Sequence, residues 1–159
     1  MSGAGNISDR GDDERPEIMH TEGIFAPDSI ESARERFEDI GPTAQVVVKE
    51  TAKAMDLDAA EYDDRVTSET IETAREVLFA SLLEAHAAPR KEFEAWLADH
   101  GYDSEGDVEL IGSGNVDHVA WHVSPDGPVI ATTYQNKREA AIGTLRRQVF
   151  GRVYRDHVG

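Results

Sequence analysis

Cysteine is absent from the 159 residues, which excludes disulfide bonds, thiolate metal ligands and a cysteine nucleophile. Long apolar runs are absent too, since no stretch reaches the roughly 18 residues that a membrane-spanning helix needs. The N-terminus also lacks the charged-then-apolar order of a signal peptide. We therefore expect a cytoplasmic protein with no membrane partner.

Positive charge is scarce. The chain has 32 Asp and Glu against 16 Lys and Arg, a net charge of -16, and 12 of the 16 basic residues are arginine. Arginine is weakly hydrated and binds carboxylates in a bidentate manner, so it suits an acidic surface. Like charges are screened beyond about 3 Å in 1 M salt, against about 8 Å in 0.15 M salt. The acidic residues are spread along the chain and do not occur in contiguous blocks. The composition therefore favours adaptation to a very salty cell interior over mimicry of nucleic-acid phosphates.

The charge divides the chain into three parts. Residues 1–22 carry a net charge of -4, residues 23–136 carry -16, and residues 137–159 carry +4. The first part has almost no apolar content, so we expect a disordered acidic tail, with Met19 as an alternative translation start. Residues 23–159 have the size of a single domain.

Helix signals dominate the first two thirds of that domain. Asp28 and Glu31 have the spacing of a capping box, and Pro42 suits the start of a second helix. Thr67 or Ser68 can cap a long helix, and Pro89 begins another. These signals predict an N-terminal bundle of about four helices.

The apolar period then changes from about 3.6 to 2, which indicates strands. The predicted strands form a three-stranded antiparallel meander and lie at residues 107–111, 117–123 and 129–134. Asn136 and Glu139 have capping-box spacing again and open a long helix to about Tyr154, packed on the core. The predicted fold class is α+β.

Arg146 is anomalous because it falls on the apolar face of the last helix, among Ile142, Leu145 and Val149. Burying an unpaired charge costs several kcal/mol, so the guanidinium must find a partner. Two interpretations stay open. Arg146 forms an ion pair with a carboxylate of the acidic helices, or it belongs to a site for an anion or acidic ligand.

Three more arginines lie on this helix, Arg147, Arg152 and Arg155, with Phe150 and Tyr154 interleaved. Such a pattern can grip a nucleic-acid backbone and stack on bases. Phosphate contacts weaken steeply in high salt, however, and the domain is acidic. The arginines are more simply explained as an internal counterweight to neighbouring acids.

His118 and His122 point to the same face of the second predicted strand. Their Cα atoms would be about 13 Å apart, too far to share a metal ion. With Glu109 and Tyr134 they form either a pocket for a small molecule or a half-solvated sheet face. We find no catalytic set, no metal site and no cofactor motif.

Five short stretches carry a resemblance, and they are GIFAP (23–27), GPTAQ (41–45), LFASLL (78–83), HVAWH (118–122) and TLRRQ (144–148). Together with the acidic, arginine-rich composition they resemble an uncharacterised haloarchaeal family of unknown function, from about residue 20 to the end. The resemblance implies a haloarchaeal cytoplasmic protein. It carries over no activity, cofactor or catalytic residue.

Three functions remain open. The first is a non-catalytic binding or regulatory module that acts through protein contacts at the final helix or an open sheet face. The second is a small-molecule binder or enzyme that uses Glu109, His118, His122 and Tyr134. The third is a nucleic-acid-binding protein that uses the arginines of the last helix.

Overall fold

The computed structural model describes residues 19–112, 116–125 and 127–158. Most of the predicted N-terminal tail lies outside these residues. Its last part was predicted wrongly, because His20–Glu22 forms an edge strand, β2. The described residues contain no helix that is both long and apolar enough to cross a membrane.

A five-stranded sheet replaces the predicted three-stranded meander, in the order β2-β3-β5-β6-β4. The further strands are β3 (Ala85–Pro89), β4 (Val108–Ile111), β5 (His118–Val123) and β6 (Val129–Tyr134). Only β5 and β6 form the expected antiparallel hairpin; β4 pairs with β6 in parallel, at the sheet edge. The α+β class is confirmed, and the meander is wrong.

Strand β3 escaped prediction because its sequence, AHAAP, shows no alternation of apolar and polar residues. Four of its five residues are buried, since helices cover both faces of the sheet beside it. Small alanine side chains fit between these two layers. Alanine also has the highest helix propensity, so the local sequence favours a helix where the structure has a strand.

The helices begin close to their predicted starts. They are α1 (Ile30–Asp39), α2 (Gly41–Ala54), α3 (Ala59–Arg65), α4 (Ser68–Leu82), α5 (Arg90–Asp99), α6 (Arg138–Val149), the π-helical η2 (Phe150–Tyr154) and α7 (Arg155–Val158). Two caps differ from prediction: the Ser29 hydroxyl, not Asp28, accepts from the Ser32 amide, and α6 has Lys137 at its N-cap with no side-chain hydrogen bond.

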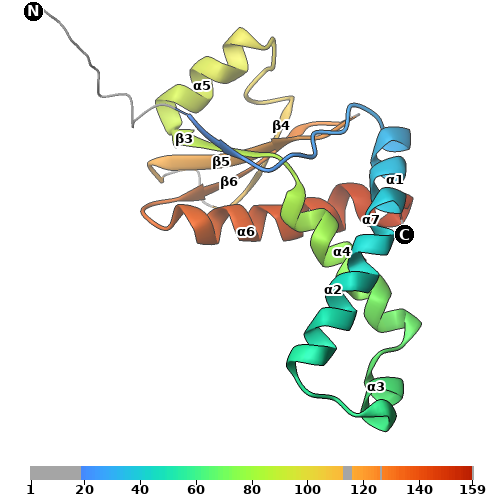
Figure 1. Ribbon diagram of the computed structural model, residues 1–159. Helices are drawn as coiled ribbons and strands as arrows, with labels where there is room; N and C mark the ends of the chain where they lie inside the picture. The colour runs from blue at the N-terminus through green and yellow to red at the C-terminus, as the bar shows by residue number, and fades with distance from the viewer. Residues whose placement is uncertain (1–18, 113–115, 126, 159) are drawn as a thin grey trace, which may run out of the picture.

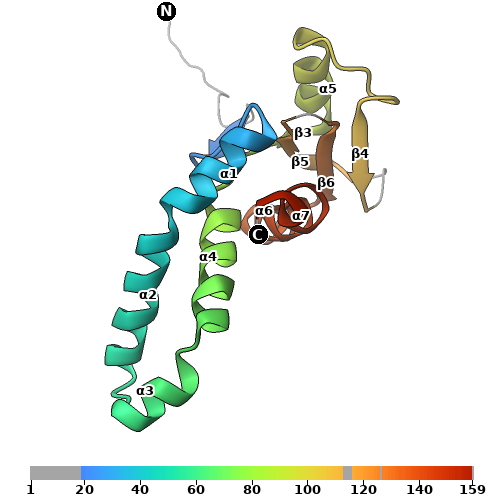
Figure 2. The same cartoon turned by 90° about the vertical axis from the view of Figure 1, so that its right-hand side faces the viewer.

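The predicted bundle of about four helices is wrong in its arrangement. Helix α5 packs on one face of the sheet, and α6 packs on the other (Figure 2). Helices α2, α3 and α4 form an arm that extends away from the sheet (Figures 1 and 2). The predicted long C-terminal helix does pack on the core, as α6, η2 and α7 in succession.

Phe79 of α4 lies at the centre of the larger core cluster. Its ring centroid is 5.5 Å from that of Phe25, 5.7 Å from Phe37, 5.8 Å from Phe150 and 5.4 Å from Tyr154. This one side chain therefore joins the base of the arm to α1 and to the C-terminal helix. It fixes how α4 lies against α6 and η2.

Candidate functional site

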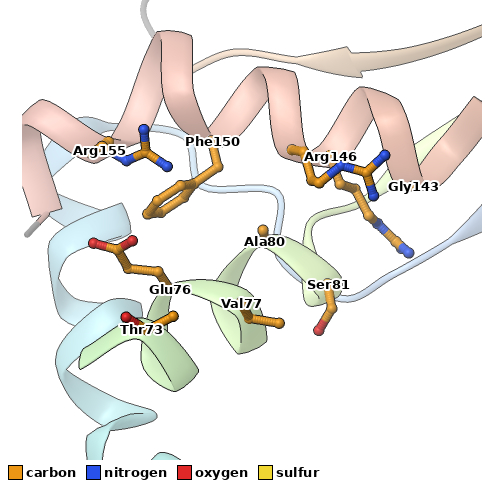
Figure 3. A pocket seen from close by; sticks show the side chains of 10 residues that line it. Thr73, Glu76, Val77, Ala80, Ser81, Gly143, Arg146, Phe150 and Arg155 are labelled. Atoms are coloured by element: carbon orange, nitrogen blue, oxygen red, sulfur yellow. The ribbon is translucent and has the colours of Figure 1, made fainter. Parts of the chain in front are cut away.

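A groove of about 440 Å³ lies between α4 and the C-terminal helix (Figure 3). Its apolar lining comes from Val77 and Ala80 of α4 and from Phe150 of η2. The remaining lining residues are polar, charged or glycine: Thr73, Glu76, Ser81, Gly143, Arg146, Arg147 and Arg155. Three of the four arginines singled out in the sequence thus meet at one place.

The Arg146 guanidinium has its partners inside the protein. Its Nε donates a hydrogen bond of 2.9 Å to the carbonyl of Leu83, and its Nη1 lies 3.6 Å from the carboxylate of Glu22 in β2. The guanidinium also passes close to Gly23, where φ is +96° and a Cβ would lie 2.3 Å from the Leu83 oxygen. Its acidic partner thus sits on the edge strand rather than on an acidic helix. Arg146 ties the edge strand and the end of α4 to α6.

Arg147 and Arg155 are both exposed and line the groove. Arg147 donates a 3.3 Å hydrogen bond to the Thr144 hydroxyl, and the Arg155 guanidinium lies 5.3 Å from the ring centroid of Phe150. Glu76 faces Arg155 across one end of the groove (Figure 3). Within the described residues, neither arginine forms an ion pair.

Arg152 belongs elsewhere, since it forms an ion pair with Glu109 of β4 and donates to the Gln148 side chain. The π-helical turn of η2 is wider than an α-helical turn and changes the angular spacing of the residues that follow it. Phe150 and Tyr154, four residues apart, are both buried in this turn. The arginines of the helix are therefore divided between the groove and the edge strand β4.

His122 is buried, so the interpretation of its face as half-solvated is wrong. Its Nδ1 donates to the Glu84 carbonyl at 2.6 Å, and the Tyr154 hydroxyl donates to its Nε2 at 2.7 Å. A carbonyl can only accept, which fixes this tautomer. Burial lowers the pKa of His122 to about 4 and raises the pKa of Tyr154. His122 is held neutral with both ring nitrogens in use.

The other polar residues of this face also make contacts inside the fold. The His118 ring stacks on Tyr134, its cross-strand partner, with 5.2 Å between centroids. Glu109 pairs with Arg152. Tyr134 packs against the core cluster that α6 shares. The four side chains predicted as a possible pocket are thus spread along the interface between the sheet and the C-terminal helix.

One group of described residues has ligating atoms close enough for a metal ion, namely His20, Glu22 and Glu139, whose atoms lie within 4.8 Å of one another. The His20 Nε2 is already 2.7 Å from Glu22, and Glu139 lies 3.4 Å from the Nε of Arg138. Contacts within the protein therefore account for this cluster.

The arginines that line the groove were identified from the sequence, but the lining residues that α4 contributes were missed. The missed residues are Thr73, Glu76, Val77 and Ser81. Thr73, Val77 and Ser81 are spaced four apart and are all exposed, so they form one stripe on α4. The only signal in the sequence was the spacing itself, a valine four residues from a small hydroxyl residue on each side.

A model described as "Family of unknown function (DUF5809)" matches residues 24–155. The expected resemblance to a family of unknown function is confirmed at that level. No curated protein and no solved structure matches the chain.

Proposed function

The chain belongs to the Family of unknown function (DUF5809), and from this premise we propose a non-catalytic module that binds an acidic, amphipathic segment of a protein partner. The site is the groove between α4 and the C-terminal helix. One observation carries the proposal: Arg147 and Arg155, without an ion pair in the described part of the chain, flank an apolar floor. Over the whole chain, acidic residues outnumber basic residues by 32 to 16.

The chemistry of the groove suits such a partner. An apolar side chain can displace water from Val77, Ala80 and Phe150, while carboxylates meet the two guanidinium groups. Electrostatic complementarity of this kind gives specificity and register. A nucleic acid fits less well, because Arg146 and Arg152 are engaged with Glu22 and Glu109, and two exposed arginines make few phosphate contacts.

A small anionic molecule is the second candidate, because about 440 Å³ lies within the size range of small-molecule sites. It would use the same two arginines and the same floor. The histidine face offers less, since both ring nitrogens of His122 are bonded inside the fold.

An NMR titration tests the groove with a synthetic helical peptide that bears leucines on one face and glutamates on the other. We expect amide shifts confined to α4, α6 and η2, and no binding by the same peptide with lysines in place of glutamates. Arg147→Glu with Arg155→Glu should weaken binding at least about tenfold, because two attractions become repulsions. Glu76→Gln should strengthen it.

The matched control is Arg65→Glu with Lys91→Glu, which changes the net charge equally at two exposed positions outside the groove. This variant should bind the peptide as the wild type does. Equal binding of the acidic and basic peptides, or shifts scattered over α5 and the sheet, would overturn the proposal. If a short dicarboxylate produces the same shifts as the peptide, the site serves a small molecule.

We further propose that the surplus acids adapt the protein to a salty haloarchaeal cytoplasm. No described Asp or Glu is buried, and the acids occur on α1, α3, α4 and α5 rather than in one block. Such a surface repels itself unless ions screen it.

Thermal unfolding followed by far-UV circular dichroism should therefore show a midpoint higher by about 10 °C or more in molar KCl than in dilute buffer, because screening removes self-repulsion. Sucrose of equal osmolarity is the control, because it favours compact states without screening charge. Equal midpoints in KCl and dilute buffer would count against halophilic adaptation.

A further inference from the structure

Arg147 and Arg155 extend along the C-terminal helix in the same way. A Cβ atom built on Gly143 would lie 3.6 Å from Nη1 of Arg147, and one on Gly151 would lie 3.8 Å from Nη1 of Arg155. Each guanidinium group therefore lies over the residue four positions before it, as expected for long side chains, which lean towards the helix N-terminus. Because both side chains lean in the same way, the distance between their charges follows from the spacing of their backbone positions.

The two charges lie about 12 Å apart along the helix, because the arginines are eight residues apart and an α-helix rises about 1.5 Å per residue. In a regular α-helix, eight residues would also turn the second side chain about 80° away from the first. The π-helical η2 lies between the two arginines, and its wider turn reduces this offset. Both arginines line the same groove, and Phe150 lies between Arg155 and Gly143 (Figure 3). The groove thus presents two positive charges about two helical turns apart, with an apolar ring between them.

Both walls of the groove are helical, and this favours a partner that is itself a helix. The backbone N–H and C=O groups of α4, α6 and η2 bond mainly within their own helices. An extended segment laid between these helices would find few backbone partners, and unpaired backbone groups are costly to bury. A helix satisfies its own backbone groups and presents side chains on one face. Positions i and i+7 of a helix share a face and lie about 10.5 Å apart, which is close to the separation of the two arginines.

We propose that the partner segment is an α-helix with two carboxylates seven residues apart and with apolar residues one turn from each. The carboxylates meet Arg147 and Arg155, and the apolar side chains meet Val77 and Phe150 between them. Glu76 lies at the Arg155 end (Figure 3), so the carboxylate at the Arg147 end should contribute more to binding. Such a partner presupposes the peptide-binding function proposed above and adds to it the conformation and the charge spacing of the ligand.

Three synthetic helical peptides of equal composition test the spacing by isothermal titration calorimetry with the full chain, at the lowest KCl concentration that keeps it folded by circular dichroism. Each peptide has two leucines and two glutamates on one face, and the glutamates are four, seven or eleven residues apart. The peptide with a spacing of seven should bind about fivefold more tightly than the other two, because a mismatched spacing leaves one arginine without its carboxylate. A proline at the centre of that peptide breaks the helix and should abolish binding.

A variant of the protein that moves one charge by a helical turn gives a second readout. Gly151→Arg with Arg155→Gln keeps the net charge and places the two groove arginines four residues apart; Gly151 is exposed, so an arginine side chain fits there. This variant should prefer the peptide whose glutamates are four residues apart. The matched control is Gln148→Arg with Arg155→Gln, which also keeps the net charge but places the arginine at an exposed position outside the groove. It should show no preference among the three peptides, since a single groove arginine remains.

Equal affinity of the wild type for the three spacings, or undiminished binding of the proline peptide, would overturn the helical partner. So would a charge-shifted variant that folds and keeps the preference of the wild type. If acidic peptides still bound more tightly than the lysine peptide, the peptide-binding function would stand without this partner; if no acidic peptide bound, both would fail. The titrations of the wild type test the proposal even where a variant does not fold.

Discussion

Phe79→Ala is expected to lower the free energy of unfolding by about 3–5 kcal/mol, the largest effect of any single change considered for this chain. Phe79 is fully buried and packs against four other aromatic rings, those of Phe25, Phe37, Phe150 and Tyr154. The loss combines the transfer free energy of the ring with the cost of a cavity between α1, α4 and η2. Urea denaturation in molar KCl, followed by circular dichroism, measures it.

Val77→Ala is the matched control for this prediction. Val77 lies two residues earlier on the same helix and is 62% exposed, so its truncation should change the free energy of unfolding by no more than about 0.5 kcal/mol. If the two variants were equally stable, the aromatic cluster would not be the centre of the core.

Acidification should destabilise the protein through His122. Its pKa is about 4 in the folded chain, against 6.5 for an unperturbed histidine, so the unfolded chain binds more protons between these values. The contribution of neutral His122 is complete above pH 6.5 and is lost as the pH falls towards 4. From pH 7 to pH 5 the free energy of unfolding should fall by about 2 kcal/mol on this account.

The double variant His122→Asn with Tyr154→Phe isolates this contribution. Asparagine can still donate to the Glu84 carbonyl without titrating, and phenylalanine removes the hydroxyl that would lose its acceptor. Burial also lowers the pKa of His86, so part of the pH dependence should remain in the variant. Urea titrations of both proteins at pH 7 and pH 5 give the difference. Parallel pH dependences would show that His122 is not the buried neutral group.

The local features of the fold were the most predictable. Caps, prolines and apolar periodicity placed α4, α5, β5 and β6 within about two residues, because these signals act over one or two turns of chain. Strand β3 and the parallel pairing of β4 with β6 could not be predicted in the same way. Both depend on contacts between segments far apart in the sequence.

In the candidate site, too, local features were predictable and long-range contacts were not. The arginines of the last helix were identified from the sequence, but their roles were not. Arg146 meets Glu22 and Leu83, which are more than 60 residues away in the chain. Arg152 meets Glu109, 43 residues away. A local pattern contains no information about such partners.

The sequence by itself determined the acidic charge, the preference for arginine over lysine, the absence of thiol chemistry and the starts of the helices. These properties depend on residue type and on short spacings, which tertiary packing leaves unchanged. Only the tertiary structure decided that His122 is buried and neutral, that Arg147 and Arg155 flank a groove, and that α2 is exposed on its outer side. Each of these depends on which surfaces the core covers and which it leaves exposed, and that depends on how α4 and the C-terminal helix pack around Phe79.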